Sequence, residues 1–359
     1  MLYYSEMRHI RRVLTGIVVA VVGLSAVVPM SASAAPGFNV ITSPLPIKIN
    51  TAPGQTVQTD LRIKNQGTQP EAIKVGLMKF AASGDNGQPN LYDLSKQDQF
   101  SSWVHFSPEV FTADPNIWYT VTMTIDVPPT ASLGYYMAVT FSPADASTTT
   151  GAANLNGSVA TLVLLNVVTP DENRALSLVS FETDHELYEY LPVNFKIKIH
   201  NSGNIYVSPA GNIFIQRGSK VVDTVDFNDA GGSVLPQSNR VYTASWTNGF
   251  PLYVEKLVNG KPVPDNHDIP KETLKWDFTQ VSKFRFGEYS AKLLAVYDNG
   301  TQDVPLEATV SFWVVPWKML LLLLAIILLV GFGLFSALRS TGKKVKSGLQ
   351  KRRHDAKAK

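Results

Sequence analysis

The feature that most constrains this chain is an uncharged apolar run near its C-terminal end, between Lys318 and Arg339. An α-helix rises about 1.5 Å per residue, so a run of this length crosses the roughly 30 Å hydrocarbon core of a bilayer. We therefore predict a transmembrane helix over residues 317–338, with membrane lipid as its surroundings. Trp313, Trp317, Lys318 and Arg339 are expected at the membrane interfaces, where Trp and basic side chains gather.

The charges that follow this run indicate its orientation. Residues 339–359 contain nine Lys or Arg residues and a single acid, Asp355. Cytoplasmic segments next to a membrane helix carry an excess of positive charge. We therefore expect a single-pass protein of the cell membrane, with the N-terminal part extracellular and a basic cytoplasmic tail.

The N-terminal end agrees with this orientation. Arg8, Arg11 and Arg12 precede an apolar run over residues 13–28, and small residues follow it at 31–35. This order is typical of a signal peptide, here residues 1–35, cleaved after Ala34 or Ala35. An uncleaved signal anchor is the alternative, because the apolar run is long.

Composition excludes several kinds of function. The chain has no cysteine, so disulfides, thiol chemistry and cysteine metal sites are excluded. The formal net charge is +3, whereas the tail alone carries nine positive charges and one negative, an excess of eight. The exterior part is therefore net acidic, and nucleic acid is not an expected partner.

The region between the two apolar runs alternates apolar and polar residues with a period of two. Clear examples are residues 57–64, 117–126, 193–200 and 306–314. Such alternation predicts half-buried strands, and many of them in series predict antiparallel β-sandwiches. The expected fold class is all-β.

An internal repeat divides this region into two copies of one fold. Residues 57–67 and 193–203 are both alternating strands that end in Asn-x-Gly, and Gly134-x-Tyr136 is matched by Gly287-x-Tyr289. We predict two immunoglobulin-like β-sandwich domains, residues 36–170 and 171–315. The Asn-x-Gly turns are expected to use positive φ.

The two matched tyrosines have a predicted structural role. Tyr136 and Tyr289 lie where strand F of an immunoglobulin-like domain begins, which is the position of the tyrosine corner. There the hydroxyl bonds to backbone a few residues upstream. An ordinary strand tyrosine is the alternative for each.

Two segments are longer than ordinary turns and are the expected places for binding. They are residues 80–99 and 250–275, predicted as loops. Asp85, Asn86 and Tyr92 in the first loop are candidate binding residues. Trp118 is a fourth candidate, because alternation in its strand directs it away from the buried face.

The sequence contains no pattern that indicates catalysis. It has no paired histidines for a metal site, no calcium-loop spacing, no Gly-x-Ser-x-Gly elbow and no phosphate-binding glycine loop. We therefore predict a non-enzyme with no catalytic residues, no metal and no cofactor. A carbohydrate-active enzyme, which needs two carboxylates across a cleft, is the least favoured interpretation.

With these features the chain resembles the WxL-interacting proteins of Gram-positive surfaces. The resemblance covers the order of all the predicted segments. In residues it is carried by Pro53-Gly54-Gln55-Thr56-Val57, by Asp85-Asn86-Gly87, by Val127-Pro128 before Gly134, and by Leu235-Pro236 before Arg240 and Trp246. It implies a non-catalytic scaffold that contacts peptidoglycan through the first domain and a protein partner or host ligand through the second.

The function expected from these features is a membrane-anchored surface protein that binds cell-wall glycan, a surface protein partner, or both. The alternative is an accessory subunit of a membrane transport, secretion or wall-assembly complex. The short connection at residues 315–316, between the last strand and the helix, favours a partner close to the membrane.

Overall fold

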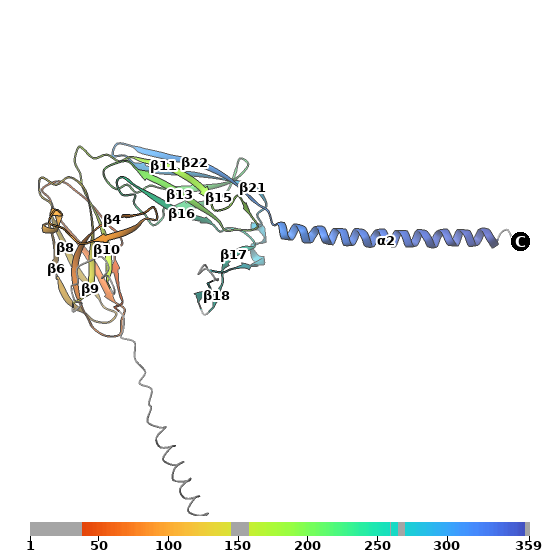
Figure 1. Cartoon of the computed structure of the whole chain (residues 1–359), viewed down its shortest axis with the longest axis horizontal. Coiled ribbons are helices and arrows are strands. Elements are labelled where there is room, and N and C mark those ends of the chain that lie inside the picture. The colour runs from red at the N-terminus through yellow and green to blue at the C-terminus, as the bar shows by residue number, and fades with distance from the viewer. Residues whose placement is uncertain (1–37, 145–157, 259, 265–269, 356–359) are drawn as a thin grey trace, which may run out of the picture.

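The computed structural model describes residues 38–144, 158–258, 260–264 and 270–355, with side chains as far as Ser336. The chain is built mostly of β-strands and ends in one long helix (Figure 1). The prediction of an all-β protein with a C-terminal apolar helix is confirmed at this level. The predicted signal peptide lies outside the described residues.

Ten strands, β1–β10, form what we call the first sheet pair. One sheet has the order β1-β3-β8-β6, the other has the order β2-β10-β9-β4-β5, and β7 also pairs with β4. Alternate side chains of both sheets, such as Ile63 and Val139, are buried between them in one apolar core. The strands are β1 (Val40–Ser43), β2 (Ile47–Thr51), β3 (Thr56–Asn65), β4 (Glu71–Ser83), β5 (Gln88–Tyr92), β6 (Val104–Ser107), β7 (Val110–Ala113), β8 (Trp118–Asp126), β9 (Leu133–Pro143) and β10 (Val159–Val167).

The second sheet pair has its own core. Its sheets have the orders β11-β13-β16 and β12-β22-β21-β14-β15, and the core between them includes Trp246 and Phe312. The strands are β11 (Leu176–Thr183), β12 (Leu187–Tyr188), β13 (Val193–Asn201), β14 (Ala210–Arg217), β15 (Lys220–Phe227), β16 (Ser238–Trp246), β21 (Gly287–Asp298) and β22 (Asp303–Val314).

The two sheet pairs repeat one topology. The order β2-β10-β9-β4-β5 in the first corresponds strand for strand to β12-β22-β21-β14-β15 in the second. One expectation is corrected: the sheets are not wholly antiparallel, because β2 runs parallel to β10 and β12 runs parallel to β22. The chain passes from one sheet to the other just before β2 and before β12, and this crossing sets their direction.

The second sheet pair contains an insertion that the first lacks. The chain passes from β8 to β9 in six residues, 127–132, whereas residues 247–286 separate β16 from β21. We call residues 247–286 the insertion. Its described part contains β17 (Leu252–Glu255), β18 (Leu257–Val258), β19 (Lys261–Pro262), β20 (Glu272–Lys275) and the 3-10 helix η3 (Phe278–Lys283). The segment predicted as a loop at 250–275 is thus partly paired, because β17 pairs with β20 and β18 with β19.

The other predicted loop, residues 80–99, is also regular over most of its length. Strand β4 continues to Ser83 and turns back into β5, and the 3-10 helix η1 (Gln99–Ser102) follows. Glycines at both ends of the turn, Gly84 and Gly87, adopt the positive φ that a tight hairpin requires. The β4–β5 hairpin is therefore a pair of hydrogen-bonded strands at the sheet edge.

Helix α2 (Trp317–Asp355) begins three residues after β22 ends at Val314. Its first 20 residues, Trp317–Ser336, have a mean hydropathy of 2.8 and none of them is buried in the protein. By length and composition this stretch is able to cross a membrane. The helix also continues through most of the segment predicted as a tail, because Lys, Arg, Gln and Ala favour helix.

The repeated Asn-x-Gly motif is a buried side-chain clamp, and positive φ has no part in it. Asn201 is fully buried, its Nδ2 donates to the carbonyls of Ile205 (2.8 Å) and Val234 (2.9 Å), and its Oδ1 accepts from the N–H of Gly203 (2.8 Å). Asn65 makes the corresponding three bonds in the first sheet pair. Neither motif uses positive φ, so the predicted turn geometry was wrong.

In each sheet pair one tyrosine hydroxyl accepts a hydrogen bond from a backbone N–H three residues earlier. In the first sheet pair this tyrosine lies one residue before the predicted one. Tyr289 Oη accepts from the N–H of Phe286 (3.3 Å), three residues earlier. The equivalent contact in the first sheet pair is made by Tyr135, which accepts from the N–H of Ser132 (3.4 Å). Tyr136, the predicted corner residue, instead has a buried hydroxyl without a hydrogen-bond partner among the described residues.

We expect Asn201→Ala to lower the free energy of unfolding by about 2–4 kcal/mol, because it leaves three buried backbone groups without their partners. Urea unfolding of the full chain in detergent micelles, followed by Trp fluorescence, measures the change. Ser202→Ala is the matched control, since Ser202 is an exposed residue of the same turn. Equal stability of the two variants would contradict the clamp.

Candidate binding cleft between the two sheet pairs

The β4–β5 hairpin reaches from the first sheet pair to the second. The carbonyl of Asp85, at the hairpin tip, accepts from the N–H of Val241 in β16 at 2.5 Å. The Asp85 carboxylate also forms an ion pair with Lys198 of β13 at 2.5 Å. The Lys198 ammonium keeps the pKa of Asp85 below its usual range through this bond. One backbone contact and one charged contact therefore attach the hairpin tip to the second sheet pair.

A second contact between the sheet pairs is made by Lys48 in β2. Its side chain is exposed along much of its length, but the ammonium donates to the carbonyl of Gly231 (2.7 Å) and to Ser208 Oγ (2.8 Å). Partial burial, and then the positive charge of Arg240, lower the pKa of Lys48. The two cations are therefore close enough to repel each other.

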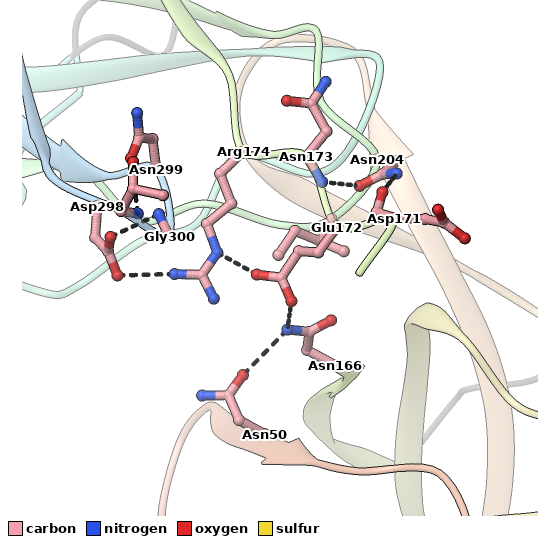
Figure 2. Close-up of polar contacts among 12 residues, drawn as sticks. Asn50, Asn166, Asp171, Glu172, Asn173, Arg174, Asn204, Asp298, Asn299 and Gly300 are labelled. Atoms are coloured by element: carbon pink, nitrogen blue, oxygen red, sulfur yellow. Dashed lines mark hydrogen bonds and ion pairs between the residues drawn. The ribbon is translucent and has the colours of Figure 1, made fainter. Parts of the chain in front are cut away.

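The connection between the sheet pairs is fixed by a polar network, shown in Figure 2. Glu172 accepts from Asn166 of β10 (3.1 Å) and pairs with Arg174, whose Nη1 donates to Asp298 of β21 (2.9 Å). Asn166 also donates to Asn50 of β2 at 3.4 Å. The network thus links two strands of the first sheet pair to the second, and it includes a carboxylate with only 11% of its side chain exposed.

Between these contacts lies an apolar cavity of about 490 Å³. One wall is the outer face of the sheet that contains β10, β4 and β5, and the other is the segment after β15 with the start of β16. We call this space the cleft. The side chains that line it include Phe80, Leu91, Leu162 and Leu164 from the first sheet pair and Leu235 and Arg240 from the second.

Arg240 is the charged group of the cleft. Its Nη1 donates to the carbonyl of Ser233 (2.9 Å) and its guanidinium lies over the Tyr242 ring, 5.2 Å from the centroid. Its Nε is buried and has no hydrogen-bond partner among the described residues. A Cβ on Gly87 would lie 2.7 Å from this Nε, so a larger residue there would displace the guanidinium, and the positive φ of Gly87 also favours glycine. The cleft is therefore apolar, with one incompletely bonded cation.

The four candidate binding residues lie in different places. Asp85 bonds to the second sheet pair as described, and Asn86 accepts from the N–H of Gln88 within the hairpin turn (3.0 Å). Tyr92, at the end of β5, is 43% exposed and Trp118, at the start of β8, is 48% exposed. Only Asp85 and Asn86 are adjacent to the cleft, and their side chains serve the hairpin and its attachment.

Three of the four residues predicted for the membrane interfaces, Trp313, Trp317 and Lys318, lie around the start of α2. Trp313 and Trp317 are both exposed, and Lys318 Nζ forms an ion pair with Glu189 at 2.6 Å. Arg339 lies within α2, but its side chain is outside the described part of the structure.

Sequence reasoning missed the cleft, although one signal was present. Strand β10 has the sequence VATLVLLNV, in which apolar residues occupy both alternating sets. Thr161, Val163 and Leu165 face the core, so Leu162 and Leu164 must face the other side of the sheet. An apolar residue on both faces indicates a strand that is covered twice.

The described residues contain no group of three or more His, Cys, Asp or Glu side chains placed to hold a metal ion.

No family model and no curated protein matches this chain. Solved structures of chaperones resemble it distantly. The class 5 fimbriae chaperone CfaA is 12% identical, covering 76% of this chain and 99% of its own, with a TM-score of 0.33. The YadV chaperone is 12% identical, with 76% and 99% covered and a TM-score of 0.31, and E. coli DraB is 13% identical, with 76% and 96% covered and a TM-score of 0.30.

We expect Glu172→Ala to loosen the attachment of the two sheet pairs and to lower stability by about 1–3 kcal/mol, because it leaves the Arg174 guanidinium and the Asn166 amide without their acceptor. Since the chain has no cysteine, spin labels can be attached at Gln58→Cys and Lys220→Cys, both exposed. The distance distribution between the labels should broaden.

The matched control for this experiment is Asp171→Ala, an exposed acid one position away. It should leave the distribution unchanged. A distribution as narrow in Glu172→Ala as in the control would show that the network does not fix the cleft.

Proposed function

We propose that this protein is a non-catalytic, membrane-anchored binding protein whose cleft holds an apolar segment of a protein partner. The observation that carries the proposal is the cleft itself. A cavity of about 490 Å³ is within the usual size range of ligand sites, which are mostly apolar with a few placed polar groups. Its walls are side chains from both sheet pairs, and the two sheet pairs are attached to each other by the contacts described above.

The cation that lines the cleft indicates the partner's charge. Arg240 has a buried Nε without a hydrogen-bond partner among the described residues, and its positive charge also lowers the pKa of Lys48, which lies outside the cleft lining. A carboxylate placed beside the guanidinium would bond to it and offset its charge. The best-fitting ligand is therefore an apolar peptide segment that carries a carboxylate, from either an acidic side chain or a chain end.

The proposed location of the protein is the cell membrane. We propose that α2 spans the cell membrane and that the two sheet pairs are immunoglobulin-like domains on the extracellular side, after a cleaved signal peptide. Support comes from the apolar span of α2, the basic residues after it and the repeated topology of the sheet pairs. The resemblance to WxL-interacting proteins and the contact with cell-wall glycan stay predictions.

The test uses full-length protein in detergent micelles and fluorescent peptides with alternating apolar residues. Each peptide is made in three forms: one with a free C-terminal carboxylate, one with an internal acidic residue, and one with neither. We expect a carboxylate-bearing form to bind best, because a charge-assisted hydrogen bond contributes about 1.5–3 kcal/mol. Arg240→Ala should remove this preference, a loss of roughly tenfold or more in affinity. Leu162→Gln should weaken the binding of every form.

Val110→Gln is the matched control, because Val110 is an exposed apolar residue outside the cleft. It should bind as the wild type does. The proposal fails if Leu162→Gln binds peptide as well as this control does. It also fails if the protein binds soluble cell-wall glycan fragments and does not bind the peptides.

A further inference from the structure

The insertion in the second sheet pair carries apolar side chains that are exposed to solvent. Trp276, Phe278, Val281, Phe284 and Phe286 are each more than 40% exposed, and Phe278 is 73% exposed. We call these five residues the exposed apolar cluster. Trp276 and Phe278 stack on each other, with 6.1 Å between ring centroids, and exposed apolar surface of this kind marks an interaction site.

The exposed apolar cluster lies at the end of the second sheet pair from which α2 leaves. The insertion returns to the sheet at Gly287, and Gly287 is paired with Val314, three residues before the helix begins at Trp317. Figure 1 shows the insertion near the start of α2, on the same side of the second sheet pair as the first sheet pair. The insertion therefore lies close to the point where α2 leaves the second sheet pair.

A continuous set of contacts connects the helix to the cluster. Lys318, in the first turn of α2, pairs with Glu189 at 2.6 Å, and the same carboxylate oxygen accepts from the hydroxyl of Tyr253 at 3.1 Å. The Tyr253 ring packs on Tyr190 at 6.0 Å between centroids, and Tyr190 packs on Trp276 at 6.4 Å. The start of α2 and the cluster are thus parts of one packed surface.

The insertion is attached firmly to the sheets behind it. The N–H of Tyr253 donates to the carbonyl of Leu191, which lies between β12 and β13 (2.8 Å). Within the insertion, the N–H of Phe250 donates to the carbonyl of Lys283 (3.1 Å). The Arg285 guanidinium also lies over the ring of Trp246, a core residue, at 5.4 Å from the centroid. The cluster is therefore presented in a fixed position.

We propose that the exposed apolar cluster enters the boundary between the head groups and the acyl chains of the bilayer leaflet that α2 enters first. The inference rests on the proposed membrane anchor. Lipid is the occupant because the first 20 residues of α2 form a mostly apolar stretch that the protein leaves unburied and that is long enough to cross a bilayer, and the cluster lies next to its start. Aromatic side chains are also preferred at this depth.

The charges of the insertion favour a particular kind of lipid contact. Residues 247–286 contain six Lys or Arg and five Asp or Glu residues, so they nearly balance. Attraction to anionic head groups is therefore small, and burial of aromatic surface supplies the contact. Two attachment points, the helix and the cluster, fix the tilt of the second sheet pair and with it the orientation of the cleft relative to the membrane.

The test uses the full-length chain in phosphatidylcholine vesicles. Because the chain has no cysteine, a fluorescent label can be attached to single variants: Phe278→Cys in the cluster, Met319→Cys in α2, and Val179→Cys, an exposed apolar position of β11 away from the insertion. Lipids that carry a nitroxide near the head group quench labels at the interface. We expect quenching at 278 comparable with that at 319, and none at 179. The pattern should be unchanged when phosphatidylglycerol is added.

The outcomes separate the two proposals. Quenching at 319 with none at 278 overturns this inference and leaves the anchor in place. Quenching at 278 with none at 319 overturns the anchor, and with it the inference that the cluster enters the leaflet beside α2. Quenching at neither position overturns both. A label at 278 that is shielded from water but not quenched by lipid indicates contact with a second copy of the chain and overturns the lipid assignment.

Discussion

The second apolar face of strand β10 is the constraint on which the arrangement of this protein depends. One face of the strand belongs to the core of the first sheet pair, and Leu162 and Leu164 project from the other. Left in water these side chains would cost free energy in proportion to their exposed area. The second sheet pair covers them in part, attached by the β4–β5 hairpin, by Lys48 and by the network around Glu172. The part left uncovered is the cleft.

Buried polar groups give each sheet pair its specificity. A chain without cysteines relies on apolar burial for stability, but apolar contacts alone do not distinguish one strand arrangement from another. Asn201 and Asn65 each bond to three backbone groups from separate segments, so that strand, turn and neighbouring loop are fixed together. A misplaced segment would leave buried groups unpaired, which costs more than the bonds contribute when they are made.

The insertion shows how one repeated topology acquires two roles. In the first sheet pair a connection of six residues joins β8 to β9, and this connection contains no strand or helix. In the second, the insertion at the same place adds aromatic surface next to α2. The cleft is made by the first sheet pair together with the side of the second that is remote from the helix. The proposed partner site and the proposed membrane contact therefore use separate surfaces of the same chain.

The sequence by itself determined the elements whose signal is local. Period-two alternation located strands such as β3, β13 and β22, and the uncharged run located the apolar part of α2, because side-chain direction and helix length follow from the backbone alone. Only the tertiary structure decided which tyrosine bonds upstream, Tyr135 rather than Tyr136, since a shift of one residue reverses the face of a strand. It also decided the cleft, whose walls come from β10 and β16, about 80 residues apart in sequence. Contacts between such distant segments depend on how two complete cores pack, and no pattern within either segment records the other.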